Sequence, residues 1–282
     1  MMDVGSLDEQ VTYLDDETTE LIEDIDDFLL SWMHRSGAKP ALPPPLIATH
    51  DLDRMGYFRN FPHQANVVSV IRTDLGPLAA TDLHGERLRP ADFVVPSAAC
   101  YGIYVQYADS VLGSPGLRTC RVACARTEDS YQRFRRLRAY YVREYVYLGT
   151  PEGAKSFVED VAAWLGLLIA ETGLPADIEP AADSFFEPDS SKALMQRLSN
   201  VKQEIVYRGD LAVSSINYHR NFFGQSYDIR LPDGQHVHTA CFGAGLERWA
   251  AMMLDHYKGS TQRVREALES LRKKLVLATE PR

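Results

Sequence analysis

Three short stretches of the sequence combine residue types that could bind a phosphate and a carboxylate. Residues 126–128 read Arg-Thr-Glu, and the planar guanidinium of Arg126 can hold two oxygens at once. Residues 241–248 read Cys-Phe-Gly-Ala-Gly-Leu-Glu-Arg, in which glycines allow close backbone approach and a helix start favours an anion. Residues 212–217 add small polar side chains on a strand. Arg-x-Glu by itself is most often a surface ion pair, so the stretches indicate a binding site only when they are taken together.

The four cysteines could be metal ligands or core residues. Cys100 and Cys241 lie far apart without a CxxC spacing, so spacing alone favours buried thiols. Cys120 and Cys124 fall on one strand and face the same way, and we expect them in the core. The N-terminus lacks a basic and apolar leader, so we expect a reducing, cytoplasmic location and no disulfide framework.

Three histidines lie near these stretches, and two of them invite a metal interpretation. His236 and His238 share one face of a strand, but a half-exposed strand surface is the commoner explanation of such a pair. His219 is a weaker candidate for a supporting contact behind the site.

Length and composition fit one large soluble domain, with or without appendages. The chain has 282 residues, of which 45% are hydrophobic and 24% charged. Its net charge of −9 argues against general binding to a polyanion. The acidic residues concentrate in residues 1–30, whereas residues 133–143 hold five arginines and no acid. No apolar run approaches the ~20 residues of a membrane span, and the common nucleotide-loop and hydrolase motifs do not occur.

The sequence pattern predicts the elements that position these residues. Strands are expected at 66–72, 92–95, 118–125, 140–148, 211–217, 222–230 and 236–242, and helices at 150–173, 191–201, 243–257 and 261–277. Strands that follow one another favour an α+β fold, in which helices flank an antiparallel sheet.

The N-terminal region is predicted to be an acidic helix and a linker that precede the catalytic domain. Apolar residues between Leu21 and Trp32 recur at helical spacing and indicate one amphipathic helix that packs on the body. The proline-rich segment that follows ends this helix. We therefore expect an acidic helix and linker at residues 1–45 and a catalytic domain, which includes the last helix, at residues 46–282.

The stretches at 126–128 and 241–248, about 120 residues apart, resemble motifs 2 and 3 of class II aminoacyl-tRNA synthetases. The strand at 212–217 resembles one in seryl-tRNA-synthetase-like cores that contacts ATP and the amino acid. Five further segments look like a particular branch, the amino acid:[carrier protein] ligases, which are truncated relatives of atypical archaeal seryl-tRNA synthetases. These segments are 56–62, 97–102, 143–149, 182–186 and 238–243. The resemblance covers roughly residues 46–257.

This resemblance implies a class II synthetase-like catalytic domain and a two-step reaction. ATP first activates a small amino acid, glycine or alanine, as an aminoacyl-adenylate, and the phosphopantetheine thiol of a carrier protein then takes the aminoacyl group. Zinc is implied at Cys100, Glu144 and Cys241, where it would bind the α-amino group of the substrate. Arg126 and Arg248 are implied as the catalytic arginines on the phosphates.

The resemblance also implies further contacts and Mg²⁺ bound with ATP. The implied ATP-binding residues, besides the two arginines, are Glu128, Arg135, Arg136, Ser214, Ser215 and Asn217, and the implied substrate-binding residues are Glu144, Lys202 and Ser215.

The expected partners follow from the same comparison. The long tRNA-binding arm of a seryl-tRNA synthetase is missing and the leader is acidic, so we expect no tRNA. A carrier protein could dock on the basic residues of the last helix, although an ordinary solvated helix is the commoner explanation of such residues. They are Arg263, Arg265, Arg272, Lys273 and Lys274. Residues 56–62 resemble motif 1, which lies at subunit interfaces, so a homodimer is expected. Two alternatives remain: a related ligase with an amide-forming or tRNA acceptor, and an inert regulatory homologue.

Overall fold

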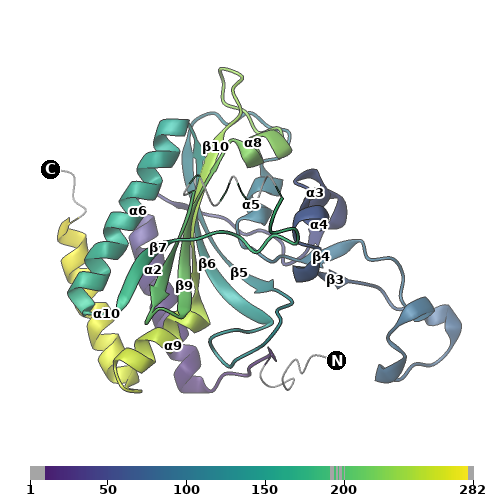
Figure 1. Cartoon of the computed structure of the whole chain (residues 1–282), viewed down its shortest axis with the longest axis horizontal. Helices are drawn as coiled ribbons and strands as arrows, with labels where there is room; N and C mark the ends of the chain where they lie inside the picture. Colours follow the sequence, from purple (N-terminus) through teal and green to yellow (C-terminus); the bar gives the residue numbers. More distant parts are fainter. Residues whose placement is uncertain (1–9, 191–193, 195, 197–198, 200, 279–282) are drawn as a thin grey trace.

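A seven-stranded sheet forms the centre of the computed structural model, which describes residues 10–190, 194, 196, 199 and 201–278 (Figure 1). In spatial order the strands are β1 (Lys39–Pro40), β5 (Gly116–Ala125), β6 (Ala139–Gly149), β10 (His238–Gly245), β9 (Leu211–Arg220), β8 (Lys202–Tyr207) and β7 (Ala176–Pro180). β1 and β5 are parallel, and the other neighbouring strands are antiparallel. The predicted α+β class is confirmed.

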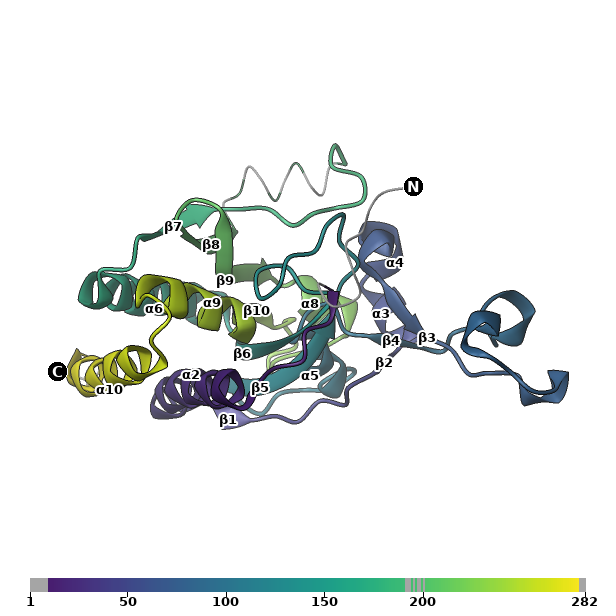
Figure 2. The ribbon, with the colours of Figure 1, turned by 90° about the horizontal axis from the view of Figure 1, so that it is seen from below.

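Long helices cover one face of the sheet, and Figure 2 shows them gathered on one side of the molecule. They are α2 (Asp16–Arg35), α6 (Pro151–Thr172), α9 (Leu246–His256) and α10 (Thr261–Ala278). The predicted N-terminal helix is α2, and it begins where the Asp15 carboxylate accepts a hydrogen bond from the Thr18 backbone N–H. Trp32 of α2 stacks on Trp164 of α6 with ring centroids 3.8 Å apart, so α2 packs into the main core.

Shorter elements cover the opposite face and form a second core. They are α3 (Thr49–Arg54), α4 (Tyr57–Asn60), α5 (Tyr101–Gln106), α8 (Phe222–Ser226) and a small sheet of β2 (Ile47–Ala48), β4 (Phe93–Val95) and β3 (Asn66–Val68). Short 3-10 helices lie at Pro62–Gln64, Thr73–Leu75, Ala80–Asp82 and Gly85–Arg87. Between β3 and β4, residues 69–92 project from the body as an arm (Figures 1 and 2).

Several predicted elements are wrong or have different bounds. The predicted strand 222–230 is helix α8 followed by a turn with left-handed backbone at Asp228 (φ 49°). Gly224 makes this packing possible, because a Cβ there would lie 2.3 Å from the Val237 carbonyl oxygen. The predicted strand 66–72 ends at Val68, where the arm begins, and α9 begins only at Leu246 because β10 extends through Gly245. The sequence pattern missed β7 and β8, and the predicted helix 191–201 falls largely outside the described residues.

Among the described helices, none combines the length and the apolar character that a membrane crossing requires.

Candidate active site

A cavity of about 620 Å³ lies between the sheet and the short elements α4, α5 and α8. Most of the predicted site residues border it: Cys100, Arg126, Arg135, Glu144, Lys202, Ser214, Ser215, Asn217, Cys241 and Arg248. Within the described part of the chain, Glu128 and Arg136 are not in its wall. The structure therefore brings residues from opposite ends of the sequence to one site.

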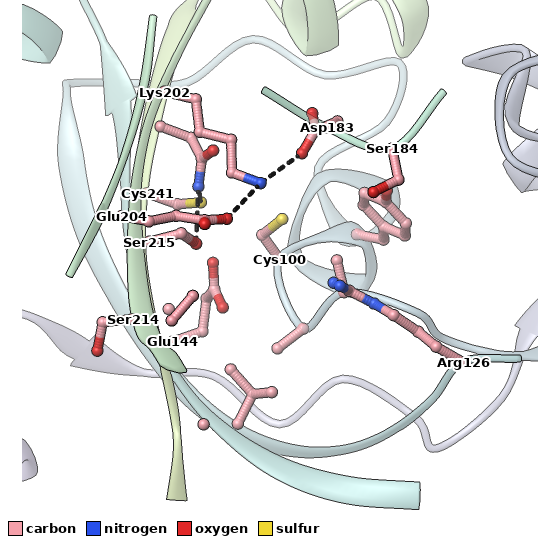
Figure 3. A pocket seen from close by; sticks show the side chains of 18 of the residues that line it. Cys100, Arg126, Glu144, Asp183, Ser184, Lys202, Glu204, Ser214, Ser215 and Cys241 are labelled. Carbon is pink, nitrogen blue, oxygen red and sulfur yellow. Dashed lines mark hydrogen bonds and ion pairs between the residues drawn. The ribbon is translucent and has the colours of Figure 1, made fainter. Parts of the chain in front are cut away.

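Cys100, Glu144 and Cys241 meet in this cavity from three different elements (Figure 3). Cys100 precedes α5, Glu144 lies on β6 and Cys241 lies on β10. One ligand atom from each residue lies within 4.8 Å of the other two, and all three residues are buried. Gly243 pairs with Glu144 across the two strands, and a Cβ there would lie 2.9 Å from the carboxylate. Glycine at this position therefore leaves room for the Glu144 carboxylate.

The pKa values of this cluster indicate that a cation would stabilise its deprotonated form. Burial raises the pKa of Glu144 to about 8. A hydrogen bond shared with Cys100, together with burial, holds the pKa of Cys241 well above its ordinary value. Three deprotonated groups this close would need a compensating cation. Two thiolates and a carboxylate suit Zn²⁺, and three protein ligands leave one position for another molecule, so these residues fit a catalytic-type zinc site.

The sulfur of Cys241 also has two polar neighbours on β9. Asn217 Nδ2 lies 3.6 Å from it and His219 Nε2 lies 3.7 Å from it. Burial lowers the pKa of His219 to about 4, so its ring is neutral at physiological pH. The sequence indicated His219 only as a weak supporting candidate, because its approach to Cys241 depends on strand pairing.

Lys202 forms a charged group on the same cavity wall (Figure 3). Its Nζ lies 2.8 Å from Asp183 Oδ1 and 3.0 Å from Glu204 Oε1. Burial raises the pKa of Asp183, but the charge and hydrogen bond of Lys202 lower it, and the pKa of Asp183 lies below its ordinary value. Gln196 Nε2 donates to the same carboxylate at 2.7 Å. The sequence indicated Lys202 as a pocket residue but did not indicate the carboxylates that hold it.

The two motif arginines border the cavity, each held by a backbone carbonyl. Arg126 Nε donates to the Ser97 carbonyl at 2.7 Å, and its guanidinium lies 5.9 Å from the centroid of the Tyr140 ring. Arg248 Nη1 donates to the Ala212 carbonyl at 2.8 Å. These bonds occupy one nitrogen of each guanidinium and leave the others for an anion.

The predicted role of the Ser214 side chain is not supported by the structure. Its hydroxyl is buried and accepts a hydrogen bond from Trp249 Nε1 at 2.7 Å. Consecutive strand residues point to opposite faces, and Ser215 faces the cavity whereas Ser214 points away from it (Figure 3). Asn217, two residues after Ser215, lies on the same face as Ser215 and also borders the cavity.

The arginine-rich loop lies only partly at the cavity. Arg135 borders it and forms an ion pair with Asp210 at 2.8 Å. Glu128 and Arg136 lie close enough to Arg248 to influence its pKa, although burial has the largest effect on that pKa and lowers it. Their predicted contacts to ATP stay predictions.

Glu247 is a buried carboxylate at the cavity that the sequence analysis did not single out. Both of its oxygens lie 3.0 Å from the Tyr141 backbone nitrogen, and burial raises its pKa to about 7. In the sequence, Glu247 could have been identified only from its place in the Gly-x-Gly-x-Glu-Arg stretch.

The other two cysteines and the two histidines near the start of β10 lie outside the group of potential metal ligands. Cys120 and Cys124 are buried in the second core, as predicted. His236 lies 3.1 Å from an oxygen of Asp228, and His238 lies 2.9 Å from the Tyr218 hydroxyl. Neither histidine joins a group of potential metal ligands in the described residues.

Two predicted interaction surfaces have a specific structural context. On α10, Arg265 pairs with Asp24 and Glu20 of α2, and Lys274 pairs with Glu171 of α6, which reduces the basic face that this helix offers. The segment 56–62 contributes Tyr57, Asn60 and Phe61 to the cavity wall, and its place in a subunit interface stays a prediction.

The chain resembles curated proteins over most of its length, although no family model matches it. Amino acid–[acyl-carrier-protein] ligase 1 of Bradyrhizobium diazoefficiens is 31% identical over 236 residues, which are 78% of this chain and 72% of that protein. Ligase 2 of the same organism is 29% identical over 74% of this chain and 67% of that protein. The type-2 serine–tRNA ligase of Methanopyrus kandleri is 23% identical over 83% of this chain.

Solved structures share the fold. The M. kandleri seryl-tRNA synthetase in complex with A. aeolicus tRNA-Sec superposes with a TM-score of 0.74 at 22% identity, over 90% of this chain. Seryl-tRNA synthetase from Pyrococcus horikoshii, complexed with ATP, gives a TM-score of 0.64 at 16% identity over 85% of this chain. The chain spans only 55% and 51% of these two proteins.

Proposed function

The chain belongs to the family of amino acid–[acyl-carrier-protein] ligases, and from that membership we propose that it activates a small amino acid with ATP and transfers it to the phosphopantetheine thiol of a carrier protein. One observation carries the proposal: the Cys100–Glu144–Cys241 cluster shares a single cavity with Arg126 and Arg248. The fold supports it, because it is also the fold of a seryl-tRNA synthetase solved with ATP.

In the first step, a carboxylate oxygen of the amino acid attacks the α-phosphorus of ATP. The bond between this phosphorus and the bridging oxygen breaks, and pyrophosphate leaves with the electron pair. Such a reaction depends on positioning and on neutralising charge. Arg126 would bridge the substrate carboxylate and the α-phosphate, and Arg248 would hold the γ-phosphate side. Mg²⁺ would accompany the triphosphate.

The remaining nucleotide contacts come from the loop after Arg126 and from β9. Glu128, Arg135 and Arg136 would contact adenine and the outer phosphates. Ser215 and Asn217 would line the amino-acid and ribose side, which agrees with their orientation toward the cavity.

Cys100, Glu144 and Cys241 would hold zinc, and their burial and donor types support this assignment. When bound, zinc supplies a Lewis acid with one free coordination position, which selects the neutral α-amino group of the substrate. The chain itself orients the substrate, because the cluster and Arg126 border the same cavity and would hold opposite ends of the amino acid.

A small substrate side chain, as in glycine or alanine, is supported by the charged group of Lys202, Asp183 and Glu204. These side chains lie on the cavity wall near the cluster. A large apolar side chain would have to desolvate them without giving them a partner.

In the second step, the carrier thiol adds to the aminoacyl carbonyl carbon, AMP leaves, and the thiol proton passes to solvent. A phosphopantetheine arm would deliver this thiol to the cavity. Residues 133–138 carry four arginines, one of which, Arg135, borders the cavity, and they are one basic segment where an acidic carrier could dock. The alternatives of a tRNA or amide acceptor, or of an inert homologue, are outcomes of the experiment below.

The experiment is amino-acid-dependent exchange between pyrophosphate and ATP with all twenty amino acids, with zinc determined on the same preparation. We expect exchange with glycine or alanine, about one zinc per chain, and aminoacylation of a phosphopantetheinylated carrier but not of tRNA. Absence of exchange with every amino acid, in a folded preparation, would reject the ligase proposal.

A matched pair of variants tests the metal site. Cys241→Ser should lose zinc and exchange activity together, because it removes one of three ligands. Cys120→Ser, also a buried cysteine, lies outside the cavity wall and should keep both. Equal zinc content in the two variants would contradict the assignment.

Two further proposals concern the whole chain. We propose a homodimer in the cytoplasm, in which the acidic helix and linker of residues 1–45 pack on a catalytic domain at residues 46–282. Sedimentation equilibrium tests the dimer, and a mass of one chain at all concentrations would reject it.

A further inference from the structure

We propose that His219 is a positioning residue, which donates its Nε2–H to the Cys241 sulfur and so orients that sulfur as a metal ligand. The inference rests on the metal site of the proposed function. It adds a residue on β9 that acts on the metal only through Cys241.

The imidazole ring is held on several sides. Nε2 lies 3.7 Å from Cys241 Sγ, while Nδ1 lies 3.1 Å from Thr239 Oγ1 and 3.4 Å from the Tyr104 hydroxyl. The ring also packs edge-on against Phe223, with centroids 4.8 Å apart. These contacts leave the ring one orientation, in which Nε2 points at the sulfur.

The direction of the hydrogen bond follows from the chemistry of a metal ligand. A metal-bound thiolate carries no hydrogen and can only accept, so Nε2 must carry the proton. A neutral imidazole has one N–H, so Nδ1 is then the acceptor. The two hydroxyls beside Nδ1, those of Thr239 and Tyr104, can donate to it. The surroundings of the ring therefore match the tautomer that a thiolate needs.

His219 is distinct from the ligands themselves. In the part of the chain that the structure describes, the mutually close donor atoms come from Cys100, Glu144 and Cys241, and His219 is not among them. Asn217 Nδ2 donates to the same sulfur at 3.6 Å, so Cys241 receives N–H groups from two side chains. Such bonds orient the sulfur and draw charge from it, which makes the bound metal a stronger Lewis acid. Partners of this kind contribute about 10–100-fold to metal affinity.

The test compares His219→Phe with wild type in the full-length protein. Zinc affinity is measured by competition with a chelator, and the thiolate-to-metal absorption is measured on the cobalt-substituted protein. We expect zinc to bind about 10–100-fold more weakly, with a shifted absorption band and unchanged far-ultraviolet circular dichroism. His238→Phe is the matched control, because His238 bonds Tyr218 on the adjacent strand and lies outside the cavity wall. It should match wild type in both measurements.

Each other outcome overturns the inference in an identifiable way. Unchanged affinity and absorption in His219→Phe would exclude a role for the N–H group. Loss of metal as complete as in Cys241→Ser, with a cobalt spectrum that has lost a nitrogen ligand, would make His219 a direct ligand instead. A wild-type protein that binds no metal would reject the metal site, and this inference with it.

A second variant covers the case in which His219→Phe fails to fold. Thr239→Val removes one hydroxyl that donates to Nδ1 of the ring and leaves the three ligands intact. It should weaken zinc binding in the same direction but less, and a wild-type affinity in this variant would contradict the proposed orientation.

Discussion

At the scale of single residues, the side chains of adjacent residues on one strand point to opposite faces of the sheet. Glu144 faces the cavity, whereas Arg143 turns to α2 and donates from Nε to Asp26 at 2.6 Å. Ser215 faces the cavity and Ser214 accepts from Trp249 on the other side. A residue's chemistry at this site therefore depends on strand parity as much as on residue type.

Glu247→Gln should stabilise the fold at high pH and not at low pH. Burial raises the pKa of Glu247 to about 7 from 4.5, so between these values the folded chain holds a proton that the unfolded chain has lost. Stability therefore falls as pH rises through this window. Glutamine removes the effect and should add about 1–3 kcal/mol at pH 8 and nothing near pH 4. Urea unfolding across this pH range is the measurement, and a variant less stable than wild type at pH 8 would contradict it.

Lys202→Met should destabilise the chain because it leaves two neighbouring carboxylates, Asp183 and Glu204, without their cation. The expected loss is about 1–3 kcal/mol at pH 7, and it should shrink in acid as the Asp183 carboxylate, whose pKa Lys202 lowers, becomes protonated. Urea unfolding measures it. Lys273→Met on the exposed side of α10 is the control and should stay within about 0.5 kcal/mol of wild type. A Lys202→Met loss no larger than this would show that the carboxylates need no partner.

At the scale of elements, α2 supports the strand that carries Glu144. Asp26 of α2 is 3% exposed and pairs with the buried Arg143, one residue before Glu144 on β6. Apolar residues of α2, among them Trp32, belong to the same core as α6 and α9. Helix α2 is thus held to the sheet by the Asp26–Arg143 ion pair and by its apolar residues in the core.

Asp26→Ala should therefore destabilise the fold by about 3–5 kcal/mol, because it leaves Arg143 buried and unpaired. Asp27→Ala, next along the helix but exposed, should change stability by less than about 0.5 kcal/mol. Thermal and urea unfolding of the pair measure the difference. Similar stabilities of the Asp26→Ala and Asp27→Ala variants would mean that water reaches Arg143 and replaces the Asp26 carboxylate.

At the scale of the whole molecule, the arm at residues 69–92 stands apart from the body. It contributes no residue to either core cluster in the described part of the chain. Its base is closed, because the Arg72 backbone N–H donates to the Arg87 carbonyl at 2.9 Å. Val70 and Leu83 of the arm are 62% and 46% exposed.

Replacing residues 73–86 by a two-residue turn should therefore leave the monomer's stability within about 1 kcal/mol of wild type, since little buried apolar area is lost. Thermal unfolding and exchange activity of the shortened chain measure this. A fall in Tm of more than about 8 °C would show that the arm stabilises the body, either within one chain or across a dimer.

The sequence by itself determined the α+β class, the helix α2, and the motif residues, because these depend on local periodicity and on residue types. Cys100, Glu144 and Cys241 were named only through a family resemblance, since 141 positions separate the two cysteines in the chain. Only tertiary structure decided that strand pairing brings the three within 4.8 Å, that Ser214 faces the core, and that His219 reaches Cys241. It also decided that residues 222–230 fold as helix and turn. The physical reason is that strand parity, register and helix packing are set by contacts between distant segments, which the order of residues along the chain does not display.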